Sequence, residues 1–208
     1  RGTWTSLYTN YAVAGYNTKR VAKEEVPKSY WDLLKPGWSG QIGMDSKSYE
    51  WFAVVIRGLG EEKGLNFMRQ LAKNKVQLRN GRDLVADLVA AGEFKLALTA
   101  YSQSYESLRQ RGAPVDWVAL DPVYANIHPV GLSSKAPNPN AGKLFIDFLL
   151  SKAGQEVLRA QKRIPDRVDT APELPRLIEG IKPVFGSPEM YGDFNRYIKL
   201  FQETFGVN

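Results

Sequence analysis

The stretch from Trp38 to Gln103 contains two successive strand–polar turn–helix units followed by a third strand. It includes the segments WSGQIGMDSKSYEWFAVVIRGLG, VQLRNGRDLVADLVAAGEF and KLALTAYSQ. Short apolar strands that alternate with helical patterns predict an α/β fold with a parallel sheet. Each strand ends in a turn rich in Ser, Asn, Gly, Lys or Arg, and parallel strands bring such turns to one sheet edge. We therefore expect a small-ligand pocket there, built from helix N-termini and nearby side chains.

Apolar spacing predicts the helices around these strands. Apolar residues recur every three or four positions over 49–59 and 61–73, and again after Asn80, where Gly92 is expected to end the helix. A short helix is expected within 26–38, stopped by Pro36-Gly37. Nearer the C-terminus we predict a helix over 141–150, a helix capped by Ser151, and an amphipathic helix over 190–205 closed by Gly206.

Charge and composition limit the classes of function. The chain of 208 residues has a net charge of +6, but its Lys and Arg residues are interleaved with Asp and Glu, so no nucleic-acid partner is expected. The one dense basic cluster, a solvated face or a site for an acidic partner, consists of Arg159, Lys162, Arg163 and Arg167. Cysteine is absent, which excludes disulfides, thiolate metal sites and cysteine nucleophiles.

No part of the sequence predicts a membrane span or an enzyme. No run approaches the roughly 18 apolar residues that a bilayer span needs. The chain opens at Arg1 without n- and h-regions, so a signal peptide is expected to have been removed or never present. A hydrolase or transferase is disfavoured because the sequence has neither a G-x-S-x-G motif nor a Walker loop, and its single histidine, His128, is isolated.

The first two turns offer groups that suit an anion. Ser46, Lys47, Ser48 and Tyr49 follow Asp45 at a helix start, where hydroxyl and N–H groups suit a carboxylate, phosphate or phosphonate. Simple N-capping is the alternative for these serines. The second turn contains Arg79, Asn80, Gly81 and Arg82. Its glycine permits close approach of the backbone to a ligand. Its arginines offer a planar fork to an anion, with Arg79 preferred over Arg82 as the contacting residue, or are merely surface charges.

Several segments together resemble the extracellular solute-binding proteins of ABC importers. They are YNTKRV, PKSYWDLLKPGWSGQIGMDS, LVAAGEFKLALTAY and HPVGLSSKAPNPNAGKLFIDFLLSKAGQEVL, and the resemblance covers about residues 10–165. The run from Pro137 to Leu158 is the most telling, because a Pro-rich segment, a helix and an S-x-x-G-Q motif follow one another there. The most similar branch contains ferric-ion, thiamine, polyamine and phosphonate binders.

This resemblance implies a type II periplasmic-binding-protein-like α/β fold, in which two lobes joined by two crossing strands close on a ligand. Tyr11–Tyr16 and Asn126–Gly131 would be the crossings. Residues 1–16 would be a remnant of lobe 1 with the first crossing, and 17–125 a complete lobe 2. Residues 126–208 would be the second crossing and the C-terminal helical part of lobe 1.

Members of the family carry much more chain before the first crossing than this sequence does. The N-terminal core of lobe 1 is therefore expected to be missing here. The apolar faces of the helices over 141–160 and 190–205 would then lack their normal sheet. We expect another copy of the chain, through self-association, or a rearranged packing to cover them.

The third loop departs from the ferric-binding members of the family, which have two adjacent tyrosines there as Fe³⁺ ligands. The matching pair here is Ser102-Gln103, after Tyr101. Direct iron chelation is therefore disfavoured, and Tyr101 is expected to stack on or hydrogen-bond an organic solute. Trp51, Asp121 and Tyr124 are further residues that could face the ligand, whereas His128 is interpreted as structural.

The resulting hypothesis is a periplasmic or extracellular solute-binding component of an ABC importer, with no catalytic residue, metal ligand or cofactor. Its partners would be a small anionic or zwitterionic solute and a membrane permease. Alternatives are a ferric-ion or ferric-complex binder, a polyamine binder that would need Asp45 and Glu50, and a ligand-sensing domain of a regulator. The candidate ligand-binding residues are Ser46, Lys47, Ser48, Tyr49, Arg79, Asn80, Gly81, Arg82, Tyr101 and Gln103.

Overall fold

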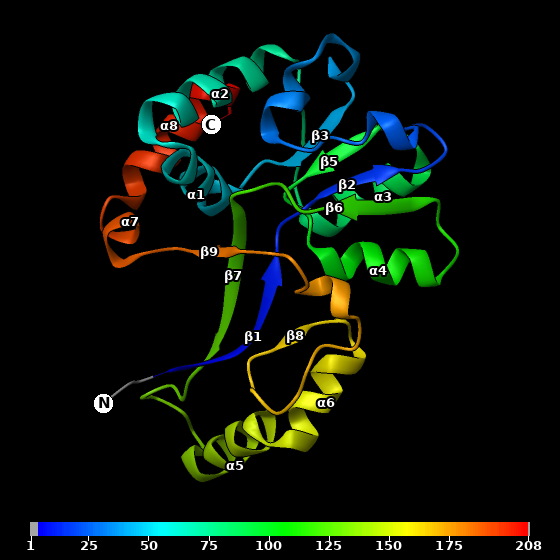
Figure 1. The fold of residues 1–208 in the computed structure, drawn as a ribbon. Helices are drawn as coiled ribbons and strands as arrows, with labels where there is room; N and C mark the ends of the chain where they lie inside the picture. Colours follow the sequence, from blue (N-terminus) through cyan, green and yellow to red (C-terminus); the bar gives the residue numbers. More distant parts are fainter. Residues whose placement is uncertain (1–3, 208) are drawn as a thin grey trace. The chain divides into compact units, whose positions relative to one another are not determined.

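The computed structural model describes residues 4–207, which form two compact units (Figure 1). The smaller unit contains the described residues up to Asn10 together with Asn126–Ile181. The larger unit contains Tyr11–Ala125 together with the described part of the chain from Lys182 onward. Helices and strands are mixed in both units, so the predicted α/β class is confirmed.

A five-stranded sheet forms the centre of the larger unit. Its strands, in spatial order, are β4 (Gln77–Arg79), β3 (Ile42–Asp45), β5 (Leu96–Leu98), β2 (Ala14–Asn17) and β6 (Val115–Val118). Strand β3 runs parallel to both β4 and β5, and Met44 lies opposite Leu78 on one side and Leu98 on the other. Strand β2 is antiparallel to β5 and β6. The carboxyl ends of β4, β3 and β5 therefore lie side by side, as the sequence predicted.

Helices cover this sheet and pack on one another. They are α1 (Tyr49–Leu59), α2 (Glu61–Lys73), α3 (Arg82–Ala91) and α4 (Ser102–Gln110). Helix α3 packs on β2, β3 and β5, whereas α4 packs on β6. The first two helices have the predicted bounds, and Gly92 ends α3 in left-handed backbone, as predicted.

The segment before β3 consists of short 3-10 turns: η1 (Lys23–Glu25), η2 (Tyr30–Leu34) and η3 (Pro36–Trp38). The short helix predicted within 26–38 thus takes the tighter form and ends at Leu34. Lys35 is extended, with ψ of 144°, because the residue before a proline is held out of helical backbone.

The C-terminal segment differs from the prediction in both shape and place. It forms two helices, α7 (Pro188–Gly192) and α8 (Phe194–Phe205), separated at Asp193. Helix α8 packs on α1 and α2 in the larger unit rather than belonging with residues 126–181. The ring of Phe201 is fully buried, 5.1 Å from Tyr49 and 5.4 Å from Phe52 between ring centroids. Its apolar stripe predicted a buried face, but the partner of that face is set by tertiary packing.

The strands β1 (Thr5–Tyr11) and β7 (Val123–Val130) carry the chain between the units. The chain therefore first passes between the units at the end of β1. Of the predicted crossing Tyr11–Tyr16, only Tyr11 belongs to β1, and the last three residues belong to β2. In the larger unit the start of β7 pairs in parallel with β9 (Pro183–Phe185).

The smaller unit also contains β8 (Ile164–Pro165), α5 (Pro139–Leu150), α6 (Lys152–Ala160) and η4 (Pro175–Leu177). Strand β8 pairs antiparallel with β1, and the Ser151 hydroxyl accepts from the N–H of Gly154, which confirms the predicted cap. No residue of α5 is buried, and three of its apolar side chains, Leu144, Phe145 and Phe148, are 72, 60 and 47% exposed.

Local contacts within the smaller unit occupy both His128 and the basic cluster. The His128 ring stacks on Tyr8 at 4.3 Å, and Arg163 lies over the same tyrosine. The other three members of the cluster form ion pairs, Arg159 with Glu156, Lys162 with Glu173 and Arg167 with Asp169. These contacts occupy the basic side chains within the unit, but Lys162 is only 8% exposed, so the cluster is not wholly the solvated face that the sequence suggested.

Candidate ligand-binding site

Hydrogen bonds join the three predicted turns at the carboxyl edge of β4, β3 and β5. The backbone N–H of Ser46 donates to the Arg79 carbonyl at 2.8 Å, which links the first turn to the second. The N–H of Gly81 donates to Asp45 Oδ1 at 2.9 Å. The N–H of Asp45 in turn donates to the hydroxyl of Thr99 at 3.1 Å, which links the first turn to the third. The convergence predicted from the strand–turn–helix pattern is therefore observed.

Asp45 organises this junction from within the protein. The residue is 5% exposed, and its second carboxylate oxygen accepts a hydrogen bond from the Ser48 hydroxyl at 3.0 Å. A buried carboxylate that accepts bonds from two turns fixes their relative position, because breaking either bond would leave the charge poorly solvated. Asp45 and Ser48 therefore have a structural role, which is to hold the turns in place.

Arg82 is the cation that the three turns surround. Its Nη1 donates to the Thr99 carbonyl at 2.8 Å, and its guanidinium lies 4.9 Å from the ring centroid of Tyr101. The carboxylates of Asp45 and Glu50 each approach it to 4.0 Å, beyond hydrogen-bond distance. The bond to Thr99 is the one hydrogen bond of this side chain within residues 4–207, so most of its N–H donors remain available.

Arg79, which the sequence favoured over Arg82, has other partners. Its guanidinium pairs with Glu93 at 2.7 Å, donates to the Leu78 carbonyl and lies over the Phe94 ring at 5.3 Å. The backbone turns sharply at Gly81, where φ is +121°, between the two arginines. As a result, Arg82 is the arginine that meets the other two turns.

The remaining predicted residues differ in their availability. Lys47 and Asn80 are exposed, and Ser46 and Gly81 are partly buried. Ser48 is fully buried, and the Tyr49 ring packs edge-on against Phe201 of α8. The Ser48 hydroxyl and the Tyr49 ring are therefore occupied by Asp45 and Phe201. Ser48 lies at the N-cap position of α1, but its side chain makes no capping hydrogen bond, so simple side-chain N-capping is not observed at this serine.

The third loop brings an aromatic and an amide to the same edge. Tyr101 forms an isolated bridge with Ala12 and receives Arg82 over its ring. Gln103 lies in the first turn of α4 and is 9% exposed. Its Oε1 has no hydrogen-bond partner within the described residues. A buried amide oxygen without a donor is costly, so a water or a solute donor is expected there.

Three residues beside these turns were missed or undervalued by the sequence. Thr99 supplies both a hydroxyl and a carbonyl to the junction. Burial, followed by the negative charge of Glu50, raises the pKa of the phenols of Tyr124 and Tyr191. Both tyrosines are therefore protonated at neutral pH and can donate hydrogen bonds. No sequence signal marks Tyr191, because α7 reaches Glu50 only through the tertiary fold.

Trp51, a further candidate, belongs to the core. It is 1% exposed, and its indole N–H donates to the Tyr30 hydroxyl at 3.3 Å. That hydroxyl donates in turn to the Pro122 carbonyl. The indole therefore has no surface to offer a solute.

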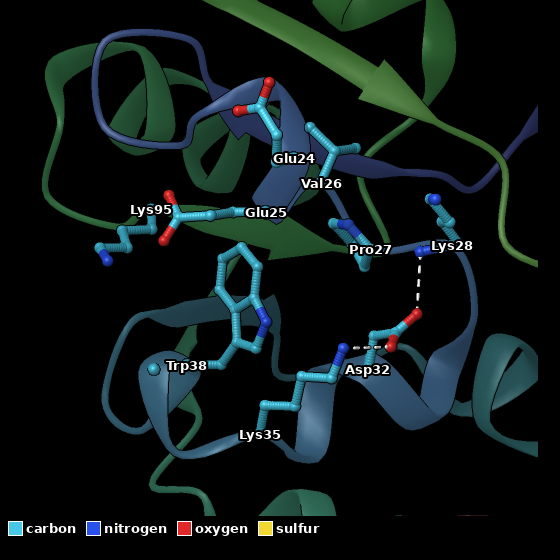
Figure 2. Close-up of a pocket in the computed structure, with 10 residues that line it drawn as sticks. Glu24, Glu25, Val26, Pro27, Lys28, Asp32, Lys35, Trp38 and Lys95 are labelled. Atoms are coloured by element: carbon cyan, nitrogen blue, oxygen red, sulfur yellow. Dashed lines mark hydrogen bonds and ion pairs between the residues drawn. The ribbon is translucent and has the colours of Figure 1, made fainter.

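A separate cavity of about 400 Å³ lies in the larger unit, and none of the predicted residues lines it (Figure 2). Figure 2 shows Trp38 among the residues that line it, and Asp32 bound to the backbone of Lys28 and to the ammonium of Lys35. Since Asp32 has these partners and Trp38 is only 6% exposed, the cavity presents no buried group that lacks a partner. It is lined by Glu24, Glu25, Val26, Pro27, Lys28, Asp32, Lys35, Gly37, Trp38 and Lys95.

Within residues 4–207, no group of three or more His, Cys, Asp or Glu side chains comes together in a way that could hold a metal ion. No helix in the described part of the chain is both long and apolar enough to span a bilayer.

Comparison with known families fits the arrangement of strands and turns. A family model described as bacterial extracellular solute-binding protein matches residues 1–187. This chain belongs to that family. Among curated relatives, the Fe(3+)-binding periplasmic protein of Serratia marcescens is 24% identical over 168 residues, which is 76% of this chain and 49% of the relative. The chain spans about half the length of the curated relatives it matches.

Solved structures show the fold of this chain. Iron-bound HitA from Pseudomonas aeruginosa aligns with a TM-score of 0.79 at 22% identity, covering 98% of this chain and 69% of HitA. The periplasmic binding protein AfuA from Actinobacillus pleuropneumoniae, with fructose-6-phosphate bound, aligns with a TM-score of 0.74 at 20% identity. The alignment covers 100% of this chain and 70% of AfuA. The predicted type II periplasmic-binding fold is thereby confirmed.

Proposed function

We propose that this protein is the solute-binding component of an ABC importer, acting in the periplasm as a carrier rather than an enzyme. It captures a small solute at the edge formed by the three turns and delivers it to a membrane permease. The observation that supports this most is Arg82, which Asp45, Thr99 and Tyr101 surround while most of its N–H donors remain available. Family membership supports the carrier role.

The charges at this edge favour a solute with an anionic group and a second, polar or cationic group. Arg82 and the backbone N–H groups at the starts of α3 and α4 suit a carboxylate, phosphate or phosphonate. Glu50 is one-third exposed, and its carboxylate lies 4.0 Å from Arg82 Nη2, where it suits an ammonium or hydroxyl group of the solute. We therefore place a zwitterion or a hydroxylated anion ahead of a simple inorganic anion.

A ferric complex is the second candidate. The relative from Serratia marcescens is a Fe(3+)-binding protein and HitA was solved with iron bound, which supports this alternative. In this chain the phenols of Tyr101, Tyr124 and Tyr191 belong to the neighbourhood of Glu50 and Arg82. Coordination of Fe³⁺ would require loss of phenol protons, which the raised pKa of Tyr124 opposes.

A thermal-shift panel on the full-length protein tests the proposal. The panel contains inorganic phosphate, glycerol phosphate, amino acids, spermidine and ferric citrate. At least one phosphate- or carboxylate-bearing compound is expected to raise the melting temperature, because a ligand that binds only the folded state stabilises it. A shift with spermidine alone would contradict the inferred charge of the solute, and a shift with ferric citrate alone would favour the second candidate.

The two arginines of the second turn form a matched pair for this test. Arg82→Gln is expected to weaken binding of the stabilising compound by about 10- to 100-fold, the loss of one charged hydrogen-bonding contact. Arg79→Gln removes the same chemistry from the same turn but breaks only the pair with Glu93, so binding should stay within about twofold of the parent. If Arg79→Gln causes the larger loss, the assignment of Arg82 is wrong.

A further inference from the structure

Thr99 has an unusual backbone for its residue type. Its φ is +75°, in the left-handed region, and the residue is completely buried. The other non-glycine residues with positive φ in the described chain are Lys75 and Lys162, each directly after the C-cap of a helix, where such backbone is common. Thr99 follows a strand and is β-branched, so its conformation is disfavoured and must be imposed by its surroundings.

The surroundings that impose it belong to the candidate site. The parallel pairing of β3 with β5 ends at Met44 and Leu98. One residue later the Thr99 hydroxyl accepts from the N–H of Asp45 at 3.1 Å. A side-chain oxygen thus serves the Asp45 N–H where the strand pairing stops, and this bond anchors Thr99 to β3.

The left-handed turn also determines where the carbonyl of Thr99 lies. That carbonyl accepts from Arg82 Nη1 at 2.8 Å, and the chain beyond it leads to Tyr101, over whose ring the guanidinium lies at 4.9 Å. Extended backbone at this position would continue the strand and turn the carbonyl toward a neighbouring strand. The strained residue therefore determines the positions of both groups that hold Arg82, which are its own carbonyl and the Tyr101 ring.

We propose that Thr99 is the positioning residue of the solute site: anchored through its hydroxyl to Asp45, it directs its carbonyl at Arg82 and fixes the guanidinium over Tyr101. Its importance for binding depends on the proposed function, but its effect on Arg82 does not. Local strain retained beside a binding group is a known way of preorganising a site, at the expense of stability.

Nuclear magnetic resonance of the unliganded protein tests this without any solute. The signal of the Arg82 Nη1–H group that donates to the Thr99 carbonyl should be displaced by the Tyr101 ring current and should exchange slowly with water. In Thr99→Val, which keeps the shape but lacks the hydroxyl, we expect this signal to lose its displacement and to exchange about tenfold faster, as for loss of a charged hydrogen bond. Thr99→Ser keeps the hydroxyl and should match the parent within about twofold.

Controls separate positioning from general damage. Thr18→Val makes the same change at an exposed threonine of the larger unit and should leave the Arg82 signal unchanged. If Thr99→Val does not fold, Thr99→Ala gives the same comparison, because alanine lacks the hydroxyl but enters left-handed backbone more easily than valine. An unchanged Arg82 signal in the variant without the hydroxyl, or an equal loss in Thr99→Ser, would overturn the proposal.

The proposed function and the positioning role of Thr99 can be refuted independently of each other. If no compound of the panel stabilises the parent protein while the Arg82 signal responds to Thr99 as described, the positioning role stands and the solute-binding role does not. If a compound binds and Thr99→Val leaves the Arg82 signal unchanged, the reverse holds.

Discussion

Replacing Phe201 by alanine is expected to destabilise the larger unit by about 4 kcal/mol, within the range for burial of a phenylalanine in a packed core. The ring is fully buried and has three aromatic neighbours, with centroid distances of 5.1 Å to Tyr49, 5.4 Å to Phe52 and 4.9 Å to Phe205. Its removal would leave a cavity between α8 and α1, since a helix held at both sides of the gap collapses only partly.

Thermal unfolding followed by tryptophan fluorescence measures this loss. Trp38 and Trp51 are buried in the larger unit, so the signal reports the unit that contains α8 even if the two units unfold separately. In a chain of this size the unfolding midpoint falls by about 2–4 °C for each kcal/mol of lost stability. The midpoint of Phe201→Ala should therefore fall by roughly 8–16 °C. The matched control is Phe145→Ala on α5, where the ring is 60% exposed and the midpoint should move by no more than about 2 °C.

The comparison distinguishes two placements of the C-terminal helix. The sequence placed 190–205 and 141–160 together, both without a sheet to cover them, and on that placement the two phenylalanines would behave alike. The structure places Phe201 in a core and leaves Phe145 at the surface. Equal midpoint changes in the two variants would refute the packing of α8 against α1.

Two further predictions follow from surface groups. Leu144, Phe145 and Phe148 form an exposed apolar face on α5, so the chain is expected to self-associate as its concentration rises; Phe148→Ser should reduce this in sedimentation equilibrium, and a monomer at every concentration would contradict it. The hydrogen bond from Lys35, then that from the Lys28 N–H, lowers the pKa of Asp32 to about 2, so this carboxylate stabilises the fold above its unfolded pKa of about 4, and the contribution disappears as the pH falls toward 2. Asp32→Asn should therefore melt earlier than the parent at neutral pH but not near pH 2, and a difference that persists in acid would contradict the assignment.

Local patterns were sufficient for most elements of the larger unit. Apolar spacing gave the bounds of α1 and α2, and glycine gave the left-handed ends of α3 and α8. These features depend on residues close in sequence, through helical periodicity and backbone preferences. The break at Asp193 between α7 and α8 was missed although Gly192 directly precedes it, because the apolar spacing continues from Met190 into Phe194 and Tyr197.

Within the candidate site, the sequence located the turns but not the roles of their residues. Arg79 and Arg82 have the same chemistry and lie three positions apart, and only the packed structure pairs one with Glu93 and brings the other to Asp45. Thr99 had no signal at all, because neither its hydroxyl partner nor its positive φ can be read from neighbouring residues. Both outcomes depend on how separate strands come into register.

The sequence by itself determined that three polar turns follow three parallel strands, since that order depends on local apolar patterns and on the right-handed connection of parallel strands. The tertiary structure alone decided that α8 packs on α1, and that Asp45 and Thr99 hold Arg82 over Tyr101. The physical reason is that an apolar stripe or a charged side chain specifies the kind of partner it needs, while the partner itself is selected by the free energy of the whole packed chain.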